Sequence, residues 1–457
     1  MRILLVFIPI FLRVTVSAQS PPEDKNLLHY FSNGELSGQI RDFTMSTINA
    51  GELDDYYANA IGASIHYETL PFKGFSVALN GIFVYRVFSN DILAIDTIAQ
   101  DHSQYELQLF NIKDKGNFSD LDRLEELYVK YERDKLAFTY GKMEIESPLV
   151  RLHDGRMKPK VFSGFKTNVS LHSHNITGAW FTKASPRSTT HWYPVAHAIG
   201  IYSNGFTTEG DEAHYHDQIS SAGLGILGLD MKLNKNTNIN AWNYYLDNIS
   251  NSTLIKVDIT KDTGVYGGFM YLYQRPINSG GNIDPRYTFH QSTERTNLLS
   301  GSLGYHFGFC DVKANATHIL HSGRFLFPRE FGVDPSYTYI SRSQIEGQGN
   351  ATSFGITVLK NIKNIEVKLD WNRMLTDNRA LYNKYMLPSY DQFNLDCSYG
   401  FEDKLDGLEL RLLYVYRRST DRDIVLSKQH NTVNFNQINV VANFNFAMQR
   451  NHHNLSH

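Results

Sequence analysis

The feature that most constrains this chain is a repeated pair of alternating segments joined by a tight turn. From Asn59 to Glu68 mainly apolar residues alternate with polar or small ones. The same alternation recurs from Phe75 to Arg86, after the turn Leu70–Gly74. A period of two places apolar and polar side chains on opposite faces of a strand. Two such strands around a short Pro- and Gly-containing turn predict an antiparallel hairpin.

This hairpin unit recurs along the chain with connections of two very different lengths. Short turns are expected at Arg133–Asp134, Lys360–Asn364 and Asp403–Gly407, whereas Phe88–Asp120 is a long polar connection. Short turns at one end and long loops at the other are typical of barrels that cross the outer membrane. We therefore predict an all-β fold, a transmembrane antiparallel β-barrel formed by a single domain.

The two ends of the chain suit export to the outer membrane. Residues 1–18 combine a basic start, a short apolar core and small residues at a cleavage position, which is the pattern of a secretory signal. No run of 18 apolar residues follows, so a transmembrane helix is not expected. The barrel domain is assigned to residues 19–446, where the last alternating strand ends on an aromatic residue, and residues 447–457 to a polar tail.

Composition narrows the function classes. The net charge of −3 provides no global field for nucleic acid, so no such partner is predicted. Aromatic residues make up 13% of the chain and recur at apparent strand ends, as the girdles of a membrane barrel do. The spacing of Cys310 and Cys397 requires no disulfide.

The two faces of the predicted strands differ in charge. The apolar faces are assigned to lipid, because an Arg or Lys near the midplane of that face costs about 2–4 kcal/mol. This lipid face includes Ile40, Leu79, Leu369 and Leu410. The basic residues assigned to the pore wall are Arg41, Lys368, Arg373, Arg411 and Arg417. Since Arg417 and Arg418 are adjacent, one of the two must face outward, near the lipid head groups.

The stretch from Tyr140 to Phe165 interrupts the alternation. Its Pro and Gly residues make it neither strand nor helix. Between Ser147 and Lys166 it carries the bases Arg151, Arg156, Lys158, Lys160 and Lys166 against one acid, Asp154. We predict that this loop folds into the barrel and forms the charged narrow point of a pore.

At three places the chain resembles the OprD-type family of outer-membrane porins, and the likeness extends over essentially the whole mature chain. The first place is Gly34–Arg41, followed by Tyr57–Gly62 and Leu70–Gly74. The second runs from Tyr140–Lys142 through Asp154–Pro159 to Phe162–Gly164, and the third is Gly323–Gly332. The second is similar to the family's inward-folded third loop and the last to a long external loop.

The resemblance implies a barrel of about 18 strands, narrowed by inward loops, in the outer membrane of a Gram-negative bacterium. It implies uptake of small water-soluble solutes, often with a carboxylate, past basic side chains, and no cofactor. Outer-membrane lipid and small solutes are then the partners, and the barrel is a monomer or a homotrimer. The resemblance makes Arg156 and Lys158 candidates for the narrow point, Arg41 and Arg411 for the wall, and the loop with Arg324 and Arg329 a cover for the external mouth.

Basic side chains suit such a pore because a carboxylate loses hydration on entering it. A planar guanidinium replaces those hydrogen bonds two at a time. Several modest sites along the wall allow release, whereas one deep site would retain the solute.

Three alternatives remain open. The first is a soluble exported binding protein, because a β-sandwich also alternates, with its polar face outward. The second is an outer-membrane hydrolase, for which His321 and Ser322 are merely adjacent and no GxSxG occurs. The third is a surface metal site at His172 and His174 or at His214 and His216 beside Asp217, although four ligands are usual. The GxGxxG match at Gly223–Gly228 lies in a strand-like run without a following helix, which favours close strand packing over a nucleotide site.

Overall fold

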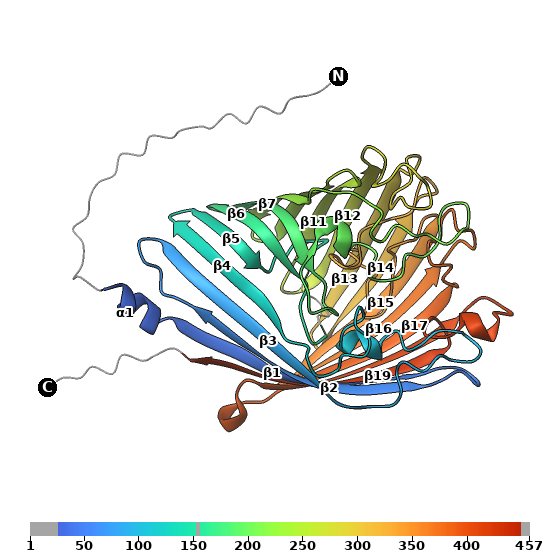
Figure 1. Ribbon diagram of the computed structural model, residues 1–457, viewed down its shortest axis with the longest axis horizontal. Coiled ribbons are helices and arrows are strands. Elements are labelled where there is room, and N and C mark those ends of the chain that lie inside the picture. Colours follow the sequence, from blue (N-terminus) through green and yellow to red (C-terminus); the bar gives the residue numbers. More distant parts are fainter. Residues whose placement is uncertain (1–25, 152–155, 449–457) are drawn as a thin grey trace, which may run out of the picture.

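A closed antiparallel sheet of 18 long strands forms the body of the protein (Figure 1), as predicted. The computed structural model describes residues 26–151 and 156–448. Within them each long strand pairs with its neighbours in sequence, and β1 pairs with β19 to close the ring. The predicted boundaries at residues 18 and 446 stay predictions: the first lies outside the described residues, and β19 continues to Met448.

The bounds of the elements are as follows. The long strands are β1 (Glu35–Ile48), β2 (Tyr56–Glu68), β3 (Phe75–Ser89), β4 (Arg123–Arg133), β5 (Leu136–Met143), β6 (Val161–Leu171), β7 (His174–Ser185), β9 (Leu224–Asn234), β10 (Thr237–Leu246), β11 (Ser250–Ile259), β12 (Gly264–Pro276), β13 (Thr296–Phe307), β14 (Cys310–Ile319), β15 (Ala351–Ile362), β16 (Ile365–Leu375), β17 (Tyr390–Gly400), β18 (Leu408–Ser419) and β19 (Phe435–Met448). The two-residue strand β8 (Tyr193–Pro194) pairs only with β7. The helices are α1 (Leu27–Ser32), α2 (Val195–Ala198), η1 (Glu106–Leu109), η2 (Asp403–Leu405) and η3 (Leu426–Lys428). None of the helices in the described residues has the length and apolarity to cross a membrane.

The connections differ in length between the two ends of the barrel. Tight turns join β2 to β3, β4 to β5 and β15 to β16 at one end, whereas residues 90–122, 144–160, 186–223 and 320–350 are long loops at the other. Gly74 has a φ of +87° in the β2–β3 turn, and a Cβ there would lie 2.7 Å from Glu132 O, so this turn requires glycine. In outer-membrane barrels the short turns are periplasmic, which gives this barrel its direction in the membrane.

The outer face of the barrel is apolar, as predicted. Ile40, Leu79, Leu369 and Leu410 point away from the interior, with exposed fractions of 46%, 48%, 49% and 42%. Aromatic pairs lie near both ends of the strands, for example Tyr57 with Phe88 at the loop end and Phe75 with Tyr131 at the turn end. Such rings are at home at the boundaries between hydrocarbon and water.

The assignment of Arg373 to the pore wall is corrected by the structure. Arg373 shares the outward face of β16 with Leu369 and Leu375, which are exposed, while the intervening Asn372 and Met374 are buried. It forms two hydrogen bonds to Asp391, of 2.8 and 2.6 Å. Arg373 lies near the loop end of its strand, where the cost of an outward charge falls because the head groups are within reach. Of the two adjacent arginines on β18, Arg417 is buried inside the barrel and Arg418 is exposed.

The interior is not uniformly polar, because loops pack against inward apolar side chains in the loop half of the barrel. Loop 90–122 brings Leu107 and Phe110 against Phe43, Met45 and Tyr56 of the wall. Loops 144–160 and 320–350 contribute a second apolar cluster that includes Leu149, Phe325, Phe327 and Phe331 and the wall residues Tyr244 and Leu254. Apolar contacts inside the ring therefore hold the loops in the barrel.

Ile40→Arg tests the orientation of the wall. Because Ile40 faces lipid between the two aromatic boundaries, we expect the substitution to destabilise the folded barrel by about 2–4 kcal/mol. Folding into lipid vesicles under urea titration, followed by heat-modifiable gel mobility, measures the loss. Gln39→Arg is the matched control, since Gln39 bonds Asn445 on the opposite face and can keep an added charge in water. Equal losses for both variants would contradict this wall orientation.

Candidate functional site

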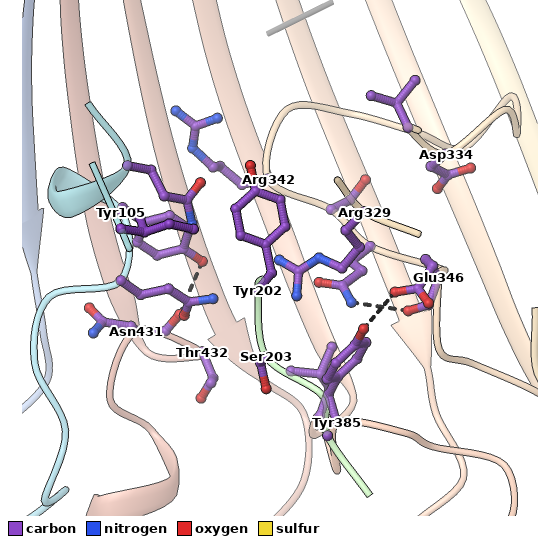
Figure 2. A pocket seen from close by; sticks show the side chains of 18 of the residues that line it. Tyr105, Tyr202, Ser203, Arg329, Asp334, Arg342, Glu346, Tyr385, Asn431 and Thr432 are labelled. Carbon is purple, nitrogen blue, oxygen red and sulfur yellow. Dashed lines mark hydrogen bonds between the residues drawn. The ribbon is translucent and has the colours of Figure 1, made fainter. Parts of the chain in front are cut away.

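The inward loops and the wall enclose a chamber of about 560 Å³ at the loop end of the barrel. We name it the basic chamber, because seven of its lining residues are basic and three are acidic. The bases are Lys115, Arg156, Lys160, Arg187, Arg329, Arg342 and Arg417, and the acids are Asp101, Asp334 and Glu346. Figure 2 shows Arg329 and Arg342 on either side of the Tyr202 ring.

Loop 144–160, which was predicted to fold inward, contributes Arg156 and Lys160 to the chamber. Arg156 has a φ of +50° and is almost completely buried, and its carbonyl oxygen accepts a hydrogen bond from Arg41 of the wall. Lys160 donates from Nζ to the carbonyl oxygen of Gly332 in loop 320–350. These two bonds fasten the loop to the wall on one side and to a second inward loop on the other.

The other predicted residues of this loop lie elsewhere. Lys158 does not line the chamber: it is almost completely buried and donates to Leu121 O at 3.2 Å, close to the Arg123–Glu125 ion pair. Arg151 is half-buried and also lies outside the chamber lining. Asp154 lies outside the described residues.

Among the predicted wall residues, Arg417 lines the chamber. Its guanidinium donates to Gln392 Oε1 at 3.0 Å and to Thr432 O at 2.9 Å, and it lies 4.4 Å from the centre of the Tyr390 ring. Arg41, Arg411 and Lys368 also face inward but do not line the chamber. Arg411 is bound by both its Nε and Nη2 atoms to Asp396, and Lys368 pairs with Asp370 at 3.0 Å.

Loop 320–350 enters the barrel, whereas the family resemblance implied that it covers the external mouth. Leu326 N donates to Gln274 of β12, and Thr338 O and Ser341 O accept from Asn372 of β16 and Asn394 of β17. The loop therefore contacts strands on well-separated parts of the ring and narrows the pore together with loop 144–160.

The two arginines predicted in this loop have different surroundings. Arg324 is buried, pairs with Glu294 at 2.8 Å and donates to Phe206 O and Ala380 O, so it joins four loops. Arg329 lines the chamber, and its guanidinium lies 5.3 Å from the centre of the Tyr385 ring. Arg324 is thus a structural residue, while Arg329 contributes charge to the chamber.

Three basic residues of the chamber were not predicted. Arg342 donates from Nε to Gln437 Oε1 at 2.6 Å and from Nη2 to Asn439 Oδ1 at 3.2 Å, both on β19. Arg187 donates to Gln108 at 2.9 Å, and Lys115 contacts His102. All three are in long loops without periodicity, so no pattern in the sequence predicts which way their side chains point.

Burial brings the pKa of three loop groups, Asp334, Lys158 and Glu144, to about 7. Burial raises the pKa of the Asp334 carboxyl to about 7, and Asp334 lines the chamber. Burial also lowers the pKa of the Lys158 amine to about 7. As pH rises through this range Asp334 becomes negative and Lys158 neutral, so both changes remove positive charge from the region of the narrow point.

The structure gives no support to the rival motifs. Gly225 and Gly228 lie inside β9, and a Cβ at Gly228 would meet the Trp242 ring at 2.5 Å, which accounts for the glycine by close packing. In the described part of the chain no group of three or more His, Cys, Asp or Glu is placed to hold a metal ion. Cys310 and Cys397 are both free.

Comparisons with known proteins agree with this architecture. The family model described as outer membrane porin, OprD family, matches residues 100–303. No curated protein sequence matches the chain. Among solved structures, OccK9 (OpdG) of Pseudomonas aeruginosa superposes with a TM-score of 0.72 at 12% identity, covering 92% of this chain and 100% of that one.

Two further structures are similar. OpdK of Pseudomonas aeruginosa, solved with vanillate, has a TM-score of 0.67 at 13% identity and covers 92% of this chain and 100% of its own. OccAB4 of Acinetobacter baumannii has a TM-score of 0.68 at 13% identity and covers 91% of this chain and 98% of its own.

The closed barrel with its inward loops is the architecture of outer-membrane porins, which are channels and not enzymes. Over residues 100–303 the chain is similar to outer-membrane porins of the OprD family, as its sequence motifs implied.

Arg342→Ala tests whether the chamber depends on the bonds between loop and wall. The variant loses the bonds to Gln437 and Asn439 and one positive charge, so we expect a larger single-channel conductance and a smaller preference for anions in planar bilayers. Arg422→Ala is the control, because Arg422 is exposed in loop 420–434 and does not line the chamber. An unchanged conductance in a correctly folded Arg342→Ala barrel would contradict the role of these bonds.

A dependence on pH follows from the loop groups with a pKa of about 7, which are Asp334, Lys158 and Glu144. We expect the preference for anions to be stronger at about pH 5.5 than at about pH 8.5, because Asp334 is then neutral and Lys158 charged. The reversal potential in a salt gradient measures the preference. In Asp334→Asn the change with pH should shrink, and a full-sized change in that variant would assign the titration to other groups.

Proposed function

We propose that this protein is a porin that lets small water-soluble solutes with a carboxylate diffuse across the outer membrane of a Gram-negative bacterium. The observation that carries the proposal is the excess of basic over acidic residues around the chamber, seven against three, in the narrowed part of the barrel. Amino acids, small organic acids and peptides are the candidate solutes. Vanillate, which is present in the OpdK structure, is itself a carboxylate.

The chamber can attract a carboxylate without trapping it. The seven bases come from several loops and from β18, so an anion meets positive charge on more than one side of the passage. Arg156, Lys160 and Arg417 each donate at least one hydrogen bond inside the protein, which fixes the positions of their charges. Fixed charges in a partly dehydrated passage stabilise an anion at short range. Spreading them over several positions keeps each contact modest, so that release remains possible.

The acidic residues limit the depth of this attraction. Glu346 accepts a hydrogen bond from Tyr385 at 2.9 Å and lies 3.9 Å from Lys384, so part of its charge is balanced within the loops. Its carboxylate nevertheless lies on the chamber together with Arg329. A mixed lining of this kind favours the passage of anions over their retention.

A matched pair of solutes tests the proposal. N-acetylglycine carries a carboxylate, and N-acetylglycinamide has nearly the same size without the charge. We expect proteoliposomes to admit the carboxylate faster than the amide, and the double variant Arg156→Gln, Lys160→Gln to bring the two rates close together.

Lys363→Gln is the control, because Lys363 lies in the exposed β15–β16 turn at the opposite end of the barrel. Equal rates for the two solutes in the unmodified porin would overturn the carboxylate preference while leaving the channel itself intact. The absence of any conductance in correctly folded protein would overturn the channel.

A further inference from the structure

A hollow of about 410 Å³ lies on the outer face of the barrel, where β11, β12 and β13 are neighbours. The residues around it include Ile259, Val265, Gly267, Phe269, Leu303 and Lys261. It is separate from the basic chamber and shares no residue with it. We name it the outer groove.

The outer groove exists because one outward position of β12 has no side chain. Gly267 is paired with Ile259 of β11 and with Leu303 of β13. Val265 and Phe269 are its neighbours on the same face of β12, two residues away in each direction. Four large apolar side chains therefore surround a position that is empty.

The empty position is built into the backbone. A Cβ at Gly267 would lie 2.4 Å from the carbonyl oxygen of Ser302, so the glycine allows a close approach between β12 and β13. The surrounding side chains project outward, with exposed fractions of 52% for Val265, 53% for Phe269 and 63% for Leu303. The groove is therefore apolar, and it faces the hydrocarbon of the membrane.

Lys261 adds a positive charge at one end of the groove. It is exposed in the turn between β11 and β12, which belongs to the periplasmic end of the barrel, and it is part of the groove lining. Asp262 is in the same turn but does not line the groove. An ammonium group beside an apolar hollow, at the level of the lipid head groups, complements a lipid that carries both an acyl chain and a phosphate.

We propose that the outer groove is a binding site for one anionic phospholipid of the periplasmic leaflet. An acyl chain lies over Gly267 between Ile259 and Leu303, and the head-group phosphate meets the ammonium of Lys261. The apolar lining excludes water as the occupant, because water does not fill an apolar hollow. The lysine at head-group depth narrows the choice further, because its positive charge favours a lipid with an anionic head group.

The experiment is native mass spectrometry of the full-length porin in detergent, titrated with phosphatidylglycerol or, separately, with phosphatidylethanolamine. We expect one tightly bound phosphatidylglycerol per barrel and weaker binding of phosphatidylethanolamine. Lys261→Gln should weaken phosphatidylglycerol about fivefold, the equivalent of about 1 kcal/mol for one lysine at a membrane surface. Leu303→Phe, which fills the groove, should abolish the discrete bound species.

Two matched variants serve as controls. Leu299→Phe makes the same substitution on the same face of β13, and Lys235→Gln removes a lysine from the adjacent β9–β10 turn; neither residue lines the groove. Both should retain the lipid. Heat-modifiable mobility and unchanged channel conductance verify that each variant is folded, and Ile259→Phe replaces Leu303→Phe if that variant does not fold.

Three outcomes would overturn the proposal. The first is a broad, unsaturated series of lipid adducts in the unmodified porin. The second is equal retention of phosphatidylglycerol by Leu303→Phe and Leu299→Phe. The third is a doubled protein mass that Leu303→Phe returns to that of a single chain, which would assign the groove to contact with a second copy.

Discussion

The structure depends on the closure of its sheet by the pairing of β1 with β19. The two strands are paired from Leu36 with Met448 to Ile48 with Asn436. Without this pairing each strand would present a row of unbonded N–H and C=O groups to hydrocarbon, at a cost of several kcal/mol for each group. Once the ring is closed, every long strand has two neighbours. The sequence of a strand then determines which side chains face lipid and which face the interior.

A ring of 18 strands encloses more space than its own side chains can fill. In this protein the loops occupy that space, and they do so by the same apolar packing that stabilises a soluble core. Phe325, Phe327 and Phe331 of loop 320–350 are buried inside the barrel, and Leu107 and Phe110 of loop 90–122 are buried against another part of the wall. The buried apolar side chains of the loops therefore hold in place the charged residues that line the chamber.

The sequence predicted the barrel well because strand periodicity and lipid exposure are local properties. Ile40, Leu79, Leu369 and Leu410 were placed on the outer face by alternation together with the cost of charge in hydrocarbon, and the structure agrees. Arg373 was misplaced because its assignment relied on the cost of charge in hydrocarbon, and that cost falls close to the end of a strand, where this residue bonds Asp391.

The chamber was only partly predictable, because an irregular loop has no fixed alternation of faces. The density of basic residues between Ser147 and Lys166 indicated an inward loop, but nothing local distinguished Lys160, which lines the chamber, from Lys158, which binds Leu121 O. Arg342 reaches the chamber through contacts with Gln437 and Asn439, about a hundred positions further along the chain. Contacts of that kind follow from the closed ring and cannot be read from periodicity.

Several basic side chains of the interior are anchored on main-chain carbonyl groups. Lys160 bonds Gly332 O, Arg41 bonds Arg156 O, Arg417 bonds Thr432 O and Arg324 bonds Phe206 O. Every residue type has a carbonyl group, so an anchor residue with room for another side chain can be replaced without loss of the bond, whereas Gly332 is held by its contact with Phe327. Loop sequences in barrels of this architecture can consequently diverge at such positions while the pattern of interior charge persists.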